Sequence, residues 1–240
     1  MDRRHFHRLC GSLLAGAATL HRSALAEEAP RSPAEPAADG APWPRSRLIG
    51  PDETPLTLAS LAPGDALVFH YPYRTTPCFL LRLDTAAEGG DGWPGGLDED
   101  RSVVAFSAIC SHKMTHPARP ISHIAYRGEP VEFVDADGVR QRRAGLISCC
   151  SERSVYDPAA GARVLAGPAP APLAAIRLEL DADDALVAVA SVGQDRYARF
   201  LDAFGFRLAL EHGQSDVRRR SGATSVAVPA SAYSRQQIRC

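Results

Sequence analysis

The chain lacks a long apolar run. No stretch reaches the roughly 18 apolar residues that a membrane-spanning helix needs, so we expect no stable span. Lysine is almost missing as well, because Lys113 stands alone against 26 arginines. We interpret this imbalance as composition bias of the genome rather than as a functional signal.

The chain also has no excess of basic residues. It carries 27 basic and 28 acidic residues. Without residues 1–26, which read as a removable segment, 23 basic and 27 acidic residues remain. Nucleic-acid-binding proteins present a basic face, so this composition gives no support for nucleic-acid binding.

Residues 1–26 have the layout of an export signal. The pair Arg3-Arg4 precedes Phe6, an apolar stretch covers 9–20, and Ala24-Leu25-Ala26 offers a small-x-small cleavage site. The pattern predicts export through the twin-arginine pathway to the periplasm. That route typically carries proteins already folded around a cofactor. The apolar stretch is too short to anchor the protein after cleavage.

The cysteines point to a metal. Cys10 would leave with the signal, which leaves Cys78, Cys110, Cys149, Cys150 and Cys240. An odd number cannot all form internal disulfides in an oxidising compartment, so metal ligation is the natural alternative for some of them. Cys78 and Cys240 are one possible disulfide pair.

Short β-favouring runs organise the middle of the chain. Runs bounded by Gly, Pro or Asp predict strands over 65–71, 78–83 and 102–110, while the glycine- and proline-rich stretch 86–100 predicts a loop. Two hairpins are expected, within 130–149 and 173–191, and the first turns at Asp137-Gly138. The pattern indicates an all-β fold, an antiparallel β sandwich or barrel.

The flanking segments differ from this middle part. Residues 27–47 are rich in proline, alanine and charge and are typical of an extended linker. Residues 193–240 predict a helix and a basic tail; Gly205 should interrupt the helix and Gly213 could end it. We expect the helix to pack on the sheet, and the alternative is a docking helix for a partner subunit. The apolar residues at helical spacing are Tyr197, Phe200, Leu201, Phe204 and Leu208.

Two segments that each leave a strand carry metal-ligand residue types. The first is Cys110-Ser111-His112, and the second runs from Cys149-Cys150 to Asp157. A Cys-x-His pair and a Cys-x-x-His pair on neighbouring loops can hold a two-iron cluster, with thiolates on one iron and imidazoles on the other. Neutral imidazoles leave less negative charge on the cluster, which raises its reduction potential.

In this combination the chain resembles Rieske iron–sulfur proteins over about residues 60–190. Cys110-Ser111-His112 matches the family's first ligand loop, and 154–157 matches the Ser-x-Tyr-Asp after the second. Gly167, Pro168 and Pro170 match the proline loop that closes over the cluster. The resemblance implies a Rieske-like domain over 48–192, with a cluster-binding subdomain at about 108–170 and a [2Fe–2S] cofactor.

The resemblance also implies roles around the cluster. The Ser154 hydroxyl would bond a cluster sulfide and the Tyr156 hydroxyl a ligand thiolate, both stabilising the reduced state. The alternative for Tyr156 is a core aromatic. Rieske proteins of respiratory complexes tie their two ligand loops with a disulfide. Thr115 and either Ser151 or Glu152 occupy those positions here, so that disulfide is expected to be absent.

The fourth ligand departs from the family. If Cys149 is the ligand of the second loop, the histidine position holds Glu152; if Cys150 is, it holds Arg153. We favour Cys150 with Arg153, because arginine lies one base change from histidine. A guanidinium donates and does not ligate, while a carboxylate is a harder, anionic ligand. His116 and His123 are the alternative fourth ligands, but we expect both to be exposed loop histidines.

The function implied is that of an exported electron-transfer component. It would pass single electrons between a periplasmic oxidoreductase or membrane cytochrome and a carrier, and would be a subunit rather than a catalyst itself. The alternative is a degenerate, cluster-free Rieske-like module with a structural or partner-binding role.

Overall fold

The computed structural model describes residues 42–90 and 92–240. The expected export signal and most of the expected linker lie outside the described residues. The linker boundary at 47 falls inside the first strand, which begins at Ser46. Within the described residues, no helix has the length and apolar character to cross a membrane.

The largest sheet is eight-stranded and antiparallel except where β1 (Ser46–Ile49) pairs with β15 (Thr224–Val226). The strands expected at 65–71, 78–83 and 102–110 are β2 (Ala66–His70), β3 (Pro77–Arg82) and β6 (Val103–Ser107), and they pair in that order with Phe79 opposite Phe106. In spatial order the strands are β15 (Thr224–Val226), β1 (Ser46–Ile49), β14 (Leu186–Val192), β13 (Ala175–Leu180), β6 (Val103–Ser107), β3 (Pro77–Arg82), β2 (Ala66–His70) and β16 (Val228–Pro229).

This large sheet curls on itself. Its two edge strands, β15 and β16, are separated in the chain only by Ala227, so the two edges must lie close together. Side chains of β3 alternate between two cores: Phe79 and Leu81 belong to one, Cys78 and Leu80 to the other. Such alternation is what period-2 side-chain geometry gives when both faces of a strand are covered.

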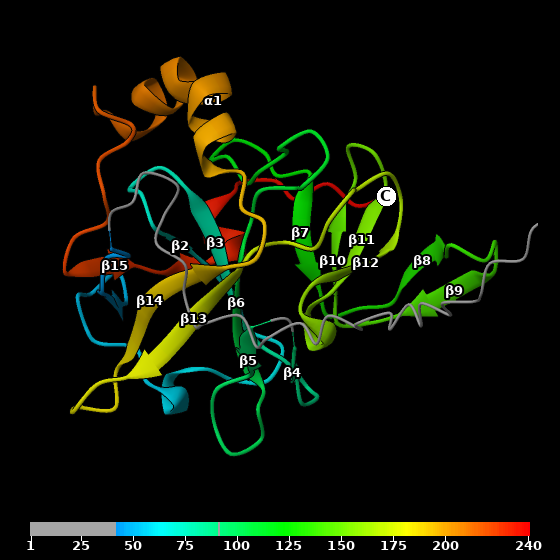
Figure 1. Cartoon of the computed structure of the whole chain (residues 1–240), viewed down its shortest axis with the longest axis horizontal. Coiled ribbons are helices and arrows are strands. Elements are labelled where there is room, and N and C mark those ends of the chain that lie inside the picture. The colour runs from blue at the N-terminus through cyan, green and yellow to red at the C-terminus, as the bar shows by residue number, and fades with distance from the viewer. Residues whose placement is uncertain (1–41, 91) are drawn as a thin grey trace, which may run out of the picture. The chain divides into compact units, whose positions relative to one another are not determined.

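A second, four-stranded antiparallel sheet packs on one of these cores. Ile124, Ile147 and Tyr156 share the core cluster of Phe79 and Phe106. The all-β class is therefore confirmed, with two packed sheets (Figure 1). The second sheet contains, in spatial order, β12 (Arg163–Ala166), β11 (Ser154–Asp157), β10 (Leu146–Cys149) and β7 (Ile124–Arg127).

Two small hairpins complete the strands. In β8 (Val131–Val134) and β9 (Arg140–Arg143) the turn lies at the expected place, and Gly138 has a φ of 77°. The stretch 86–100 is not wholly a loop, because β4 (Glu88–Gly90) pairs with β5 (Trp93–Gly95). Trp93 supplies the apolar contact for this pairing, since it packs on Phe106 with 5.3 Å between ring centroids.

The expected C-terminal helix is confirmed as α1 (Tyr197–His212). Gly205 does not interrupt it, because glycine is tolerated in a helix at a cost of about 1 kcal/mol. Gly213, at a φ of 62°, ends it in the left-handed conformation. The short helical segments are η1 (Leu58–Ser60), η2 (Pro158–Ala160) and α2 (Ala230–Tyr233).

Candidate metal centre

The two expected ligand loops meet at the end of the four-stranded sheet. Cys110 lies in the loop after β6, while Cys149 is the last residue of β10 and pairs with Ser154, the first residue of β11. The connection between β10 and β11 is therefore only residues 150–153, here called the second ligand loop. Antiparallel pairing fixes the ends of this loop and leaves its four residues to define the site.

The thiols of Cys110 and Cys149 lie together in the core. Both residues are buried and their side chains are hydrogen-bonded to each other. The bond from Cys149, aided by one from Tyr156, lowers the pKa of Cys110 to about 6 although burial opposes ionisation. The same hydrogen bond raises the pKa of Cys149. The interaction therefore favours ionisation of Cys110 over that of Cys149.

Tyr156 lies where a thiolate-bonding hydroxyl was expected. Its oxygen is 3.1 Å from the sulfur of Cys110 and accepts the backbone N–H of Ser111 at 3.2 Å. Burial raises the pKa of Tyr156, so the phenol keeps its proton and donates it to the Cys110 sulfur. The fully buried ring also belongs to the main core, so one residue combines a core aromatic with a contact to the Cys110 sulfur.

His112 and Glu152 approach each other from the two loops. The Nδ1 atom of His112 is buried without a hydrogen-bond partner in the described part of the chain. Glu152 forms an ion pair with Lys113, and this hydrogen bond lowers the pKa of Glu152; the charge of His112 acts in the same direction. Lys113 was missed from the sequence, although a single lysine beside a ligand motif was a usable signal.

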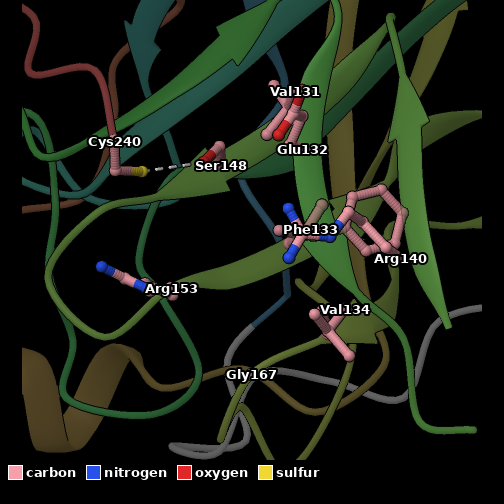
Figure 2. A pocket seen from close by; sticks show the side chains of 11 residues that line it. Val131, Glu132, Phe133, Val134, Arg140, Ser148, Arg153, Gly167 and Cys240 are labelled. Carbon is pink, nitrogen blue, oxygen red and sulfur yellow. Dashed lines mark hydrogen bonds between the residues drawn. The ribbon is translucent and has the colours of Figure 1, made fainter. Parts of the chain in front are cut away.

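Cys150 and Arg153 lie elsewhere. Cys150 forms a disulfide with Cys240, with 5.5 Å between the Cα atoms, so its sulfur is not a free thiolate. Arg153 lines a cavity of about 430 Å³ together with Ser148 and Cys240 (Figure 2). Cys150, the ligand favoured from the sequence, is therefore disulfide-bonded, whereas Cys149, the alternative, has a free thiol.

Two further expectations concern disulfides: the possible Cys78–Cys240 pair and the absent bond between the two ligand loops. Cys78 is buried and has a free thiol, so it does not pair with Cys240. Thr115 does not tie the two loops covalently, but its side chain is hydrogen-bonded to Cys149.

The proline loop contacts both ligand loops. A Cβ atom on Gly167 would lie 2.5 Å from the carbonyl oxygen of Arg153 and 2.6 Å from the Cα of Ser154. From the other side, the Ser111 hydroxyl donates to the carbonyl of Ala171 at 2.6 Å. The Ser154 hydroxyl is buried with no hydrogen-bond partner in the described residues, which suits a group that bonds a bound cofactor.

His116 differs from expectation, because it is buried. Its Nδ1–H donates to the carbonyl of Met114 at 2.9 Å, and its ring packs edge-on against Phe200 and Phe204 of α1. Burial lowers its pKa. His123 is half-buried and contributes its carbonyl, which accepts the N–H of Cys150 at 2.6 Å. Neither side chain joins the site.

The side chains at the two loops are partly of the types that hold a two-iron centre. Cys110 and Cys149 supply a thiol pair, and the unpartnered Ser154 hydroxyl adjoins it in the β10–β11 register. The remaining candidates are one imidazole, His112, and one carboxylate, Glu152. In residues 42–90 and 92–240, no three His, Cys, Asp or Glu side chains are grouped so as to hold a metal ion.

Comparisons with known proteins give limited similarity. No protein-family model matches the chain. Over 56 residues the chain is 38% identical to iodate reductase subunit IdrB of Pseudomonas sp. (strain SCT), which is 23% of this chain and 26% of that protein. The chain therefore spans about a quarter of the length of this curated relative.

Among solved structures, the chain is similar to the soluble domain of the Rieske protein II (soxF) from Sulfolobus acidocaldarius. The sequence identity is 24%, the TM-score is 0.42, and the match covers 64% of this chain and 84% of that one. A likeness at this level does not by itself establish a common site.

Proposed function

We propose that the chain is an exported electron-transfer protein that carries a Rieske-type [2Fe–2S] cluster. The carrying observation is the buried convergence of the Cys110 and Cys149 thiols, with the Tyr156 hydroxyl on the Cys110 sulfur at 3.1 Å. When bound, such a cluster supplies one-electron transfer. Cys110 and Cys149 would hold one iron, and His112 with Glu152 the other.

The chain's own residues tune this site. Tyr156 donates a hydrogen bond to the Cys110 sulfur, which stabilises negative charge there. The Ser154 hydroxyl is available for a second such bond. Glu152 acts in the opposite direction, since a carboxylate adds negative charge where an imidazole would be neutral. We therefore expect a lower reduction potential than two histidines would give.

The partner we propose is a periplasmic oxidoreductase or a cytochrome. Support comes from the segment that resembles an iodate reductase subunit and from the export-signal pattern of residues 1–26. The protein would be a subunit that passes electrons rather than the site of the chemical conversion.

The direct test is purification of the exported protein without oxygen, followed by assay of iron and acid-labile sulfide. Two iron atoms and two sulfides per chain are the stoichiometry of the proposed cluster. An electron paramagnetic resonance signal in the reduced state is also expected. A protein expressed with iron that contains neither iron nor sulfide would refute the proposal.

A pair of variants tests the ligand frame. Glu152→His should shift the spectrum to that of a two-cysteine, two-histidine site, because residue 152 is near enough to His112 for the charge of His112 to act on it. Arg153→His is the matched control, since residue 153 lines the cavity on the Cys240 side. If Arg153→His produces the shift and Glu152→His does not, the frame proposed here is wrong.

A cluster-free module is the second candidate. The observation in its favour is the ion pair of Glu152 with Lys113, which engages the carboxylate without a metal. Lys113→Met frees Glu152 and should raise iron retention if the cluster proposal holds. Unchanged absence of iron in both proteins would favour the cluster-free module.

A further inference from the structure

The last described residues run beside residues 119–127, which lie between the two ligand loops in the sequence. We call residues 234–240 the tail segment. The N–H of Ser122 donates to the carbonyl of Gln236, and the N–H of Ile238 donates back to the carbonyl of Ser122, both at 2.8 Å. The guanidinium of Arg127 donates to the carbonyl of Ile238. The tail segment is thus bonded as an extra strand-like piece beside the start of β7.

The tail segment ends in a covalent bond to the second ligand loop. Cys240 is disulfide-bonded to Cys150, 90 residues away in sequence. Figure 1 shows the corresponding end of the chain, marked C, beside β10 and β11. Cys150 directly follows Cys149, the proposed ligand, and its N–H is bonded to the carbonyl of His123 at 2.6 Å.

Apart from its paired ends and the close approach of Gly167, the second ligand loop has few other restraints. Ser151 and Arg153 are exposed, and Arg153 has a φ of 58°, a left-handed conformation that is unfavourable for a side chain with a Cβ. Glu152 is held through its ion pair with Lys113, whose own side chain is largely exposed. Exposed ion pairs contribute little to stability, so the disulfide is the strongest restraint on the loop.

We propose that the Cys150–Cys240 disulfide is a thiol-exchange site that latches the second ligand loop. Cys240 is exposed, and exposed disulfides are the ones that reductants reach. The consequence for cluster binding rests on the function proposed above; the latch itself does not. The second ligand loop, which includes Glu152, is therefore ordered when the disulfide is formed and more mobile when a thiol reductant has opened it.

The exchange is a balanced two-electron reaction with a dithiol, either a dithiol protein or a small molecule. A thiolate of the dithiol attacks the sulfur of Cys240 and displaces Cys150 as a thiolate. The second thiolate then displaces Cys240. Cys150 and Cys240 each gain a proton, and the dithiol ends as a disulfide. Cys150 is then a free thiol next to Cys149 in the chain.

The first experiment asks whether the latch exists. The protein is alkylated without reduction and digested, and the peptides are identified by mass. A linked peptide containing Cys150 and Cys240, with Cys78 alkylated only after denaturation, is the expected result. Separately alkylated Cys150 and Cys240 in protein exposed to air would overturn the proposal.

The second experiment asks what the latch does. Amide hydrogen exchange is measured in the wild type, in Cys150→Ser, in Cys240→Ser and in the double variant. The amides of Ile238 and Cys150 should exchange about ten-fold or more faster in all three variants, because their hydrogen bonds lose the covalent anchor. The double variant should equal each single variant, since all three remove the same bond.

Cys78→Ser is the matched control, because Cys78 is a free thiol whose bond to the Tyr71 carbonyl a serine can replace. Its tail amides should exchange as in the wild type. Equal exchange in the wild type and the disulfide variants would refute the latch.

Iron loss then separates the latch from the proposed function. In iron-loaded protein, dithiothreitol should accelerate iron release from the wild type, and the double variant should release iron at the accelerated rate without the dithiol. If neither dithiothreitol nor the double substitution changes the rate of iron release, the disulfide does not affect iron binding by the second ligand loop. If no variant binds iron, the cluster proposal fails, while hydrogen exchange still decides the latch.

Discussion

Gly167 offers a sharp test of how the proline loop is seated on the second ligand loop. Replacing it with alanine combines two costs. A Cβ at a φ of 83° costs about 1–2 kcal/mol from local sterics. That Cβ would also lie 2.5 Å from the Arg153 oxygen and 2.6 Å from the Ser154 Cα, which are backbone atoms that cannot rotate away. Such overpacking costs a further ~1–3 kcal/mol.

Gly64→Ala carries only the first cost, so its difference from Gly167→Ala isolates the second. Gly64 has a φ of 86°, and a Cβ there meets nothing within 4 Å. We therefore expect Gly64→Ala to lose about 1–2 kcal/mol of unfolding free energy and Gly167→Ala about 2–5 kcal/mol. Chemical denaturation followed by circular dichroism measures both values. If Gly167→Ala is no more destabilising than Gly64→Ala, the proline loop does not pack on the ligand loop as described.

Three further changes have defined outcomes. Tyr156→Phe leaves the buried N–H of Ser111 without its partner and should lower the unfolding free energy by about 1–3 kcal/mol. In iron-loaded protein the reduction potential should fall by about 60 mV for each ~1.4 kcal/mol by which the reduced state loses stabilisation. An unchanged potential would contradict the hydrogen bond to the Cys110 sulfur. Arg153→Gly should raise the unfolding free energy, measured by chemical denaturation, by about 0.5–1 kcal/mol. Glycine removes the steric strain of the left-handed conformation at a φ of 58°, and this gain exceeds the added conformational entropy of the unfolded chain. A less stable variant would count against strain at residue 153. Burial, with nearby positive charge, lowers the pKa of His70 to about 3. Between pH 6 and 4 the unfolded chain therefore binds more protons than the folded one, and this group should lower the unfolding free energy by about 1.4 kcal/mol for each unit that the pH falls. His70→Gln should flatten that part of the plot of unfolding free energy against pH, and an identical slope would refute the assignment.

Much of the fold followed from local sequence rules. The apolar run at 78–83 and its neighbours predicted consecutive strands, and β2, β3 and β6 pair in that order. The Asp137-Gly138 turn was predicted because few residue pairs accept its backbone conformation. These are properties of short segments, so a single sequence contains them. The pairing of β15 with β1 and of β16 with β2 was not predicted, since it depends on chain returning from more than 150 residues away.

The candidate site also has a part that local sequence predicted and a part that depends on distant segments. The sequence determined which residue types were available: the Cys-x-His loop, the Ser-x-Tyr-Asp run and the missing histidine. It could not choose between two frames one residue apart. The tertiary structure brings Cys240 within 5.5 Å of Cys150, Cα to Cα, and places the thiols of Cys149 and Cys110 together, which supports the frame with Cys149 and Glu152. Disulfide pairing and ion pairing depend on distances in space, and these arise only when distant segments pack.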